Sequence, residues 1–122
     1  MSDLVLIVED DANIVLSLTH LLEHDGYTVK VASDGEQALD AVEQWRPALV
    51  LLDVMLPGKD GFEVCRAIRS TPSVRDTRIV MLTARGGAAD VDRGLALGAD
   101  AYITKPFSNK DLLAQIRRLV PT

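Results

Sequence analysis

The chain has 122 residues, of which 48% are hydrophobic, and it carries a formal net charge of −5. This length suits one domain with a buried core, and the composition excludes a disordered chain. The negative charge argues against a nucleic-acid-binding surface, because such a surface needs clustered lysine and arginine to neutralise phosphates.

The single cysteine, Cys65, excludes an internal disulfide and fits a reducing compartment. No apolar run approaches the roughly 18–20 residues that a membrane span requires. The N-terminus, MSDLVLIVEDD, turns acidic where a signal peptide would be cleaved. We therefore expect a soluble, cytoplasmic domain without membrane contact that covers residues 1–122.

Short apolar runs alternate with longer amphipathic segments along the chain. The runs, each expected to form a strand, cover residues 4–8, 28–32, 48–53, 78–83 and 101–104. The segments between them place apolar residues at helical spacing, for example Ile14 with Leu18 and Leu112 with Ile116. Five strand–helix units in regular alternation predict a mostly parallel sheet with helices on both faces.

The composition of the runs also predicts the order of the strands. The first, third and fourth runs are nearly all apolar, as strands covered on both faces should be. The second run contains Lys30, which suits an edge strand. A doubly wound, flavodoxin-like α/β sheet of order 2-1-3-4-5 satisfies these observations. Ligands of such a sheet bind beyond the C-terminal strand ends, where the winding reverses between strands 1 and 3.

Polar residues follow the strands at that edge of the predicted sheet. Glu9 and Asp10 follow the first run, Asp53 ends the third, Thr83 ends the fourth and Lys105 follows the fifth. Since strands 1 and 3 should be neighbours, their three carboxylates should converge and repel one another. A hard divalent cation relieves such repulsion, and Mg²⁺ fits a site of few carboxylates and several waters. The lysine should supply a second positive charge.

Each of these residues also has a purely structural explanation. Asp11 suits the N-cap of the following helix. Asp53 could initiate the turn at Pro57-Gly58, and Lys105 could be a solvated charge. Separate explanations at four neighbouring strand ends are less economical than one shared site.

Four segments, LIVEDD, LLDVMLPGKDG, MLTA and YITKPF, resemble the signature segments of the receiver domain of two-component response regulators. Their order and spacing match over the whole chain, and GADAYITKPFS is similar to receivers that precede winged-helix DNA-binding domains. The resemblance implies a single receiver domain that takes a phosphoryl group from a sensor histidine kinase or a histidine phosphotransfer protein. It would catalyse only its own phosphorylation and dephosphorylation.

The resemblance implies roles for the acidic residues. Asp53 matches the phosphoacceptor, whose carboxylate attacks the phosphorus of a kinase phosphohistidine. Asp10 matches a direct Mg²⁺ ligand, and Glu9 matches an acidic partner that acts through water. The backbone carbonyl of Met55 matches a third metal ligand.

The resemblance also implies a switch. Thr83 matches the hydroxyl that bonds the phosphoryl group, and Lys105, before a family cis proline, matches the lysine that pairs with it. Tyr102 matches an aromatic side chain that turns inward on activation. New charge on Asp53 would pull the hydroxyl and the following glycine-containing loop inward. Arg85 in that loop either borders the route of the attacking water or is a solvated arginine.

The predicted output face consists of the helix after the fourth strand, the fifth strand and the last helix. Winged-helix receivers dimerise through this face by charged cross-pairs, which implies a phosphorylation-dependent homodimer. This chain has uncharged residues at several of those positions: Val91, Leu97, Ala101 and Gln115. Other charged positions are kept: Arg93, Asp100, Asp111 and Arg118. The resemblance to that dimer is therefore partial.

Three other functions fit the sequence less well. An aspartyl phosphatase would carry a second acid two residues after its nucleophile, where this chain has Met55. A nucleotide or flavin module needs a glycine- or hydroxyl-rich loop after the first strand, where VEDDAN is acidic. A phosphate-independent receiver is disfavoured by the complete set of site residues. The sequence leaves the cognate kinase, the output domain and the phosphate lifetime open.

Overall fold

The computed structural model describes residues 3–121, in which strands and helices alternate strictly. The elements are β1 (Leu4–Val8), α1 (Ala12–His24), β2 (Thr28–Ala32), α2 (Gly35–Trp45), β3 (Leu49–Leu52), α3 (Gly61–Ser70), β4 (Arg78–Thr83), α4 (Ala88–Ala96), β5 (Ala101–Thr104) and α5 (Asn109–Leu119). Among residues 3–121, every helix is too short or too polar to span a bilayer.

All five strands join one parallel sheet in the order β2-β1-β3-β4-β5. The predicted topology is therefore confirmed, with β2 at one edge. β3 is shorter than the run from 48 to 53, but both flanking residues stay bonded to β1. Ala48 donates from its backbone N to the Leu4 carbonyl at 2.9 Å, and Asp53 donates to the Val8 carbonyl at 3.0 Å. The phosphoacceptor candidate thus has a fixed backbone position.

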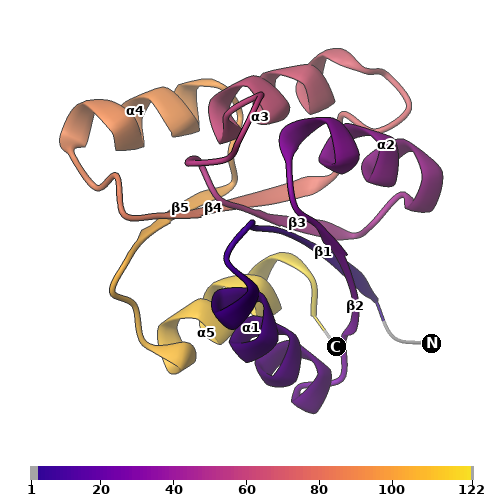
Figure 1. Cartoon of the computed structure of the whole chain (residues 1–122), viewed down its shortest axis with the longest axis vertical. Coiled ribbons are helices and arrows are strands. Elements are labelled where there is room, and N and C mark those ends of the chain that lie inside the picture. Colours follow the sequence, from indigo (N-terminus) through magenta and orange to yellow (C-terminus); the bar gives the residue numbers. More distant parts are fainter. Residues whose placement is uncertain (1–2, 122) are drawn as a thin grey trace.

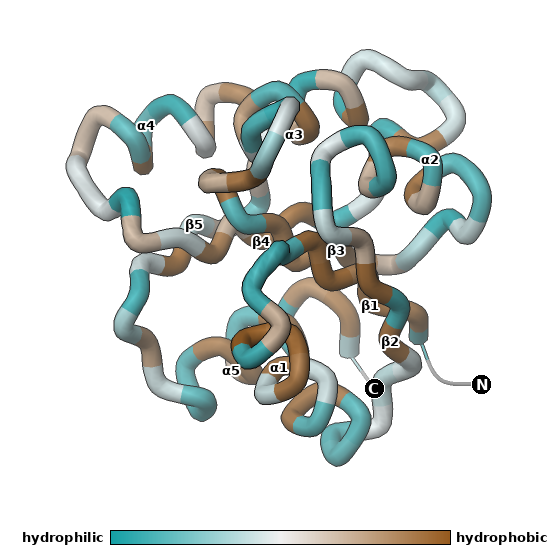
Figure 2. Tube along the Cα trace, in the orientation of Figure 1, coloured by the Kyte–Doolittle hydropathy of each residue, from teal (hydrophilic) through white to brown (hydrophobic). Residues whose placement is uncertain are grey.

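The sheet lies between two helical layers, with α1 and α5 on one face and α2, α3 and α4 on the other (Figure 1). Alternate strand residues feed the two cores: Val5 and Ile7 pack toward α1 and α5, whereas Leu6 and Val8 pack toward the other layer. Hydrophobic colour is concentrated on the strands, and the loops are mostly hydrophilic (Figure 2). Cys65 of α3 is fully buried in the core that also holds Leu6 and Val8.

Polar caps fix where helices begin. Asp11 caps α1, because its Oδ1 accepts hydrogen bonds from the backbone N of Asn13 at 2.9 Å and of Ile14 at 3.3 Å. The structural explanation for Asp11 is therefore the correct one. Asp60 caps α3 in the same way, by accepting from the Glu63 backbone N at 2.9 Å. These caps set the start of two helices that flank the C-terminal strand ends.

A charged group lies at the N-terminal ends of β4 and β5. Arg69 of α3 donates to Asp100 at 3.1 Å and to three backbone carbonyls, those of Arg75, Thr77 and Gly98. Asp100 also accepts from the Ile79 backbone N at 2.8 Å and pairs with Arg78 at 3.5 Å. We call this the Arg69–Asp100 cluster. Asp100 is therefore engaged by two arginines and a backbone amide of the same chain.

Candidate functional site

Two buried carboxylates mark the C-terminal ends of β1 and β3. The side chains of Glu9 and Asp53 belong to residues that are only 4% and 7% exposed. The Glu9 Oε2 atom accepts from the backbone N of Asp10 at 3.0 Å and of Asp11 at 3.2 Å. The Asp53 Oδ1 atom accepts from the Met55 backbone N at 3.0 Å. Backbone amides therefore hold one oxygen of each carboxylate and leave the other for a second partner.

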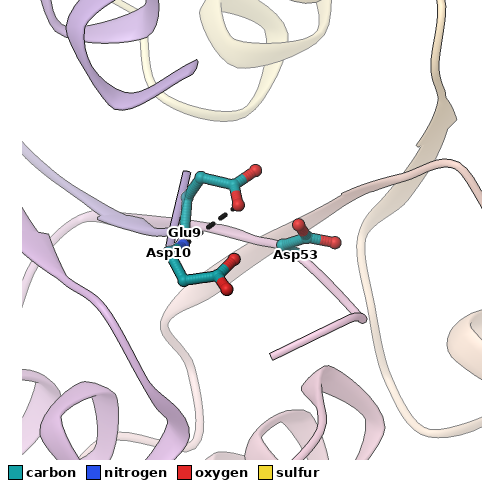
Figure 3. Close-up of side chains that lie close together, drawn as sticks. All are labelled: Glu9, Asp10 and Asp53. Atoms are coloured by element: carbon teal, nitrogen blue, oxygen red, sulfur yellow. Dashed lines mark hydrogen bonds between the residues drawn. The ribbon is translucent and has the colours of Figure 1, made fainter. Parts of the chain in front are cut away.

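Glu9, Asp10 and Asp53 form what we call the acidic cluster. One ligand atom from each lies within 4.8 Å of the others, and the close-up shows the three side chains gathered at the strand ends (Figure 3). Glu9 and Asp53 are buried, whereas Asp10 is exposed and opens the group to water. A set of carboxylate oxygens with water access is the donor set of a hard divalent cation. The residues that the sequence predicted as ligands therefore fit such an ion.

Lys105 faces the same carboxylates from the end of β5. Its Nζ atom lies 3.1 Å from Glu9 Oε1 and 3.5 Å from Asp53 Oδ2. Burial alone would lower the pKa of Lys105, but the hydrogen bond to Glu9 and the charges of Asp53 and Glu9 outweigh it and raise that pKa. The lysine is therefore charged at neutral pH. The Lys105–Pro106 peptide bond is cis, as the resemblance implies.

Thr83 ends β4 beside β3 and is completely buried. Its Oγ1 atom accepts a hydrogen bond from the Arg85 backbone N at 3.2 Å. A hydroxyl has one proton to donate besides the lone pairs it accepts with. The backbone N–H of Arg85 therefore orients the Thr83 hydroxyl, whose own proton can be donated to a group bound at the end of the neighbouring strand β3.

Tyr102 of β5 occupies a half-buried position against α4. Its hydroxyl donates to the Arg85 carbonyl at 2.5 Å. A Cβ atom at Gly94 would lie 2.7 Å from the tyrosine ring, so only glycine leaves room for the ring there. Burial and the nearby Asp90 charge raise the pKa of Tyr102 despite the opposing Arg85 charge. The tyrosine is thus turned inward and bonded to the loop after Thr83.

The loop after Asp53 completes the edge. The side chain of Met55 is 59% exposed and flanks the acidic cluster, while its carbonyl stays a predicted ligand. Gly61, which the sequence reasoning did not identify, packs so closely that a Cβ would lie 2.4 Å from the Asp53 carbonyl oxygen. Its backbone N also donates to the Val54 carbonyl at 2.9 Å. In the sequence, only its place directly after the helix cap Asp60 indicates that Gly61 has a structural role.

Arg85 is exposed, as the interpretation of a solvated arginine expects, but its side chain also has partners within the chain. Its Nη2 lies 3.0 Å from Asp90 Oδ1, and its guanidinium lies 5.7 Å from the centre of the Phe62 ring. Arg93 of α4 covers the same ring at 4.3 Å. Sequence reasoning missed Asp90 and Phe62, because one appears as a helix-surface acid and the other as a core residue.

Comparison with known proteins identifies the family. The family model described as "Response regulator receiver domain" matches residues 5–117. The DNA-binding response regulator MtrA of Mycolicibacterium paratuberculosis is 49% identical over 117 residues, which are 96% of this chain and 51% of that protein. The response regulator MprA of Mycolicibacterium vanbaalenii is 46% identical over 116 residues, 95% of this chain and 49% of that protein. This chain thus spans about half the length of these curated relatives.

Solved structures agree with the sequence matches. The receiver domain of Klebsiella pneumoniae RstA, activated with BeF3, has a TM-score of 0.91 and 32% identity, and the match covers 98% of this chain and all of that one. A putative response regulator from Chloroflexus aurantiacus has a TM-score of 0.94 and 33% identity over the full length of both chains. The chain therefore belongs to the receiver-domain family of response regulators, whose members are signalling phosphoacceptors rather than conventional enzymes, and it is similar to receivers of the winged-helix regulators.

Proposed function

We propose that Asp53 accepts a phosphoryl group from the phosphohistidine of a sensor histidine kinase or a histidine phosphotransfer protein. One observation carries this proposal. Asp53 is buried in an acidic cluster, with Oδ1 held by a backbone amide and Oδ2 facing the Lys105 ammonium at 3.5 Å. A carboxylate so placed has a fixed direction of attack, and it lies where the family has its phosphoacceptor.

The transfer needs positioning and charge compensation more than covalent chemistry from the protein. An Asp53 oxygen attacks phosphorus, the P–N bond to the donor imidazole breaks with its electron pair, and an aspartyl phosphate forms. Lys105 then moves from ion pairing with Asp53 to pairing with a phosphoryl oxygen. Thr83 donates its free hydroxyl proton to another oxygen.

Glu9, Asp10, Asp53 and the Met55 carbonyl would hold Mg²⁺ at this edge. Three carboxylates against one lysine leave an excess of negative charge in the cluster. When bound, Mg²⁺ would neutralise charge on the phosphoryl oxygens and so complement Lys105. This assignment follows from the donor set and from the family.

A groove beside Lys105 offers a docking surface for the phosphodonor. It measures about 420 Å³ and runs between α1 and the β5–α5 loop, where Ile14, Leu18, Pro106 and Phe107 contribute to its lining. Because Lys105 also lines this groove, a partner seated in it would present its histidine toward the acidic cluster. Apolar side chains at the rim of a charged site are typical of protein interfaces.

We further propose that the chain acts as one receiver domain in the cytoplasm and makes no direct contact with nucleic acid. Phosphorylation would act through Thr83 and Tyr102 on the face formed by α4, β5 and α5. That face would control an output domain or a partner, and a phosphorylation-dependent homodimer is one such output. The partner kinase and the winged-helix output are inferred from the family and from relatives such as MtrA.

Mass spectrometry tests the proposal. After incubation with acetyl phosphate and Mg²⁺, wild type should gain one phosphoryl group and Asp53→Asn should gain none. Asp60→Asn is the matched control, because it makes the same change in the same loop while asparagine keeps the α3 cap. That control should be phosphorylated as wild type is. A phosphoryl gain that persists in Asp53→Asn would refute the assignment.

A further inference from the structure

The backbone of Arg85 connects the two side chains proposed to report phosphorylation. Its N–H donates to the Thr83 hydroxyl at 3.2 Å, and its carbonyl accepts from the Tyr102 hydroxyl at 2.5 Å. One residue is therefore bonded both to the hydroxyl beside the phosphoacceptor and to the aromatic side chain on the output face. Any displacement of residue 85 must break or stretch one of these bonds.

The side chain of Arg85 fastens that backbone to two helices. Its guanidinium pairs with Asp90 in the first turn of α4 at 3.0 Å and lies over Phe62 at the start of α3. Arg93, one turn further along α4, stacks on the same ring at 4.3 Å. Two guanidinium groups therefore lie against one aromatic ring, and cation–π attraction holds both there.

The position of Phe62 is fixed by packing against the loop that follows Asp53. The ring is 1% exposed, and the residue before it, Gly61, packs against the Asp53 carbonyl and bonds to Val54. The guanidinium groups therefore rest on an element that is tied to the phosphorylation site. α4 is connected to that site through a side-chain path as well as through its own loop.

The inward position of Tyr102 depends on where α4 lies. The tyrosine ring occupies the space that a Cβ of Gly94 would fill, with ring atoms 2.7 and 2.9 Å from it. A shift of α4 toward β5 would therefore expel the ring. The contacts of Asp90 and Arg93 lie on the same helix and oppose such a shift.

We propose that the Arg85–Asp90 ion pair, seated with Arg93 on Phe62, is a latch that holds the loop and α4 in the arrangement with Tyr102 turned inward. Arg85 and Asp90 are positioning residues in this account, since they act through Thr83 and Tyr102. The latch rests on the proposed function, because the arrangement it favours is the one that receives a phosphoryl group. Breaking the pair lets the loop relax and makes that state rarer.

A double-mutant cycle tests the latch. We choose Arg85→Gln, Asp90→Asn, the double variant and the charge swap Arg85→Asp with Asp90→Arg. The first readout is the affinity for beryllofluoride with Mg²⁺, a mimic of the phosphoryl group. Each single variant should weaken binding about two- to fivefold, as an exposed pair allows. The double variant should be no weaker than the singles, and the swap should return to within about twofold of wild type.

The second readout needs no phosphoryl mimic. The chain has two tyrosines, so ring-labelled tyrosine gives two sets of NMR signals, and Tyr27, buried and bonded to the Val120 carbonyl at 2.7 Å, serves as the internal reference. The Tyr102 signals should move toward solvent-exposed values in both single variants, while those of Tyr27 stay unchanged. Asp25→Asn, which breaks the pair with Arg117 far from Tyr102, should leave the Tyr102 signals in place.

Unchanged Tyr102 signals together with additive or absent effects on beryllofluoride affinity would overturn the latch and leave an ordinary surface ion pair. Failure of wild type to bind beryllofluoride would instead refute the proposed function. The tyrosine signals would still decide whether Arg85 and Asp90 hold the loop.

Discussion

The two ends of the parallel strands each carry a charged group, and the two groups differ in charge balance. The acidic cluster sets three carboxylates against Lys105. The Arg69–Asp100 cluster sets one carboxylate against two guanidinium groups, those of Arg69 and Arg78. Both groups are partly buried, so burial alone does not separate them.

The two clusters differ in how their remaining donors and acceptors are bonded. The other N–H groups of Arg69 donate to backbone carbonyls in the α3–β4 and α4–β5 loops. Asp100 also accepts from a backbone amide of β4. That group is complete within the chain. The acidic cluster carries excess negative charge and opens to water through Asp10. A cluster whose donors and acceptors are satisfied within the chain is structural, whereas a cluster with excess negative charge and access to water is suited to take a ligand.

The largest expected loss of stability is in the Arg69–Asp100 cluster. Arg69→Ala should lower the free energy of unfolding by about 3 kcal/mol, because it leaves Asp100 without its main partner and frees three backbone carbonyls. Urea unfolding measures the change. Mg²⁺ should leave the difference from wild type unchanged, since the acidic cluster lies at the C-terminal strand ends and is intact in this variant.

Arg78→Ala is the matched control in the same cluster. Its guanidinium is half exposed and reaches Asp100 at 3.5 Å, so its removal should cost less than about 1 kcal/mol. Equal losses in the two variants would show that the backbone contacts of Arg69 contribute nothing. The Arg69–Asp100 cluster would then not be a structural group distinct from the acidic cluster.

A smaller effect is expected from Lys105→Met, which removes the lysine from the acidic cluster. In EDTA the variant should be about 2 kcal/mol less stable than wild type, because two buried carboxylates lose their cation. Mg²⁺ should recover much of that loss, in contrast to Arg69→Ala. A loss that Mg²⁺ leaves unchanged would argue against a cation site here.

The pH dependence of that difference follows from the raised pKa of Lys105. A group whose pKa is higher in the folded state stabilises the fold fully below its unfolded pKa, about 10.4 for lysine. The stabilisation is then lost as pH rises through the higher folded pKa. The gap between wild type and Lys105→Met should therefore be constant from pH 7 to about 10 and narrow above it. A gap that narrows on acidification toward pH 7 would contradict this sign.

Adjacent carboxylates at the end of β1 differ in role. Asp11 is a helix cap, so Asp11→Ala should cost about 1 kcal/mol, whereas Asp11→Asn should keep the cap and cost little. Calorimetric Mg²⁺ titration should give a dissociation constant within about twofold of wild type for both variants, since only a screened surface charge is lost. A large loss of affinity in Asp11→Asn would place this residue in the metal site.

Much of this molecule could be predicted from its sequence, because the signals are local. Apolar runs ended by polar residues marked the strands, and Lys30 marked the edge strand β2. The convergence of Glu9, Asp10 and Asp53 followed from the strand order alone. The fold and the position of the acidic cluster were therefore predictable.

The long-range side-chain contacts could not be predicted in this way. Arg69 meets Asp100 from 31 residues away, and its carbonyl acceptors carry no side-chain signal. The contact of Arg85 with Phe62 depends on how α3 and α4 pack, which the hydrophobic periodicity of the sequence does not determine. The sequence therefore left Asp100 as a surface charge and Arg85 with two interpretations.

We expect the acidic cluster to bind a divalent cation, and unfolding of Asp10→Asn with and without Mg²⁺ tests this. In EDTA this variant should be more stable than wild type by up to about 1 kcal/mol, because carboxylate repulsion is relieved. Added Mg²⁺ at ten times its dissociation constant should stabilise wild type by about 1.4 kcal/mol and the variant by much less. An Asp10→Asn protein that is less stable than wild type in EDTA, or that gains as much from Mg²⁺, would contradict the account.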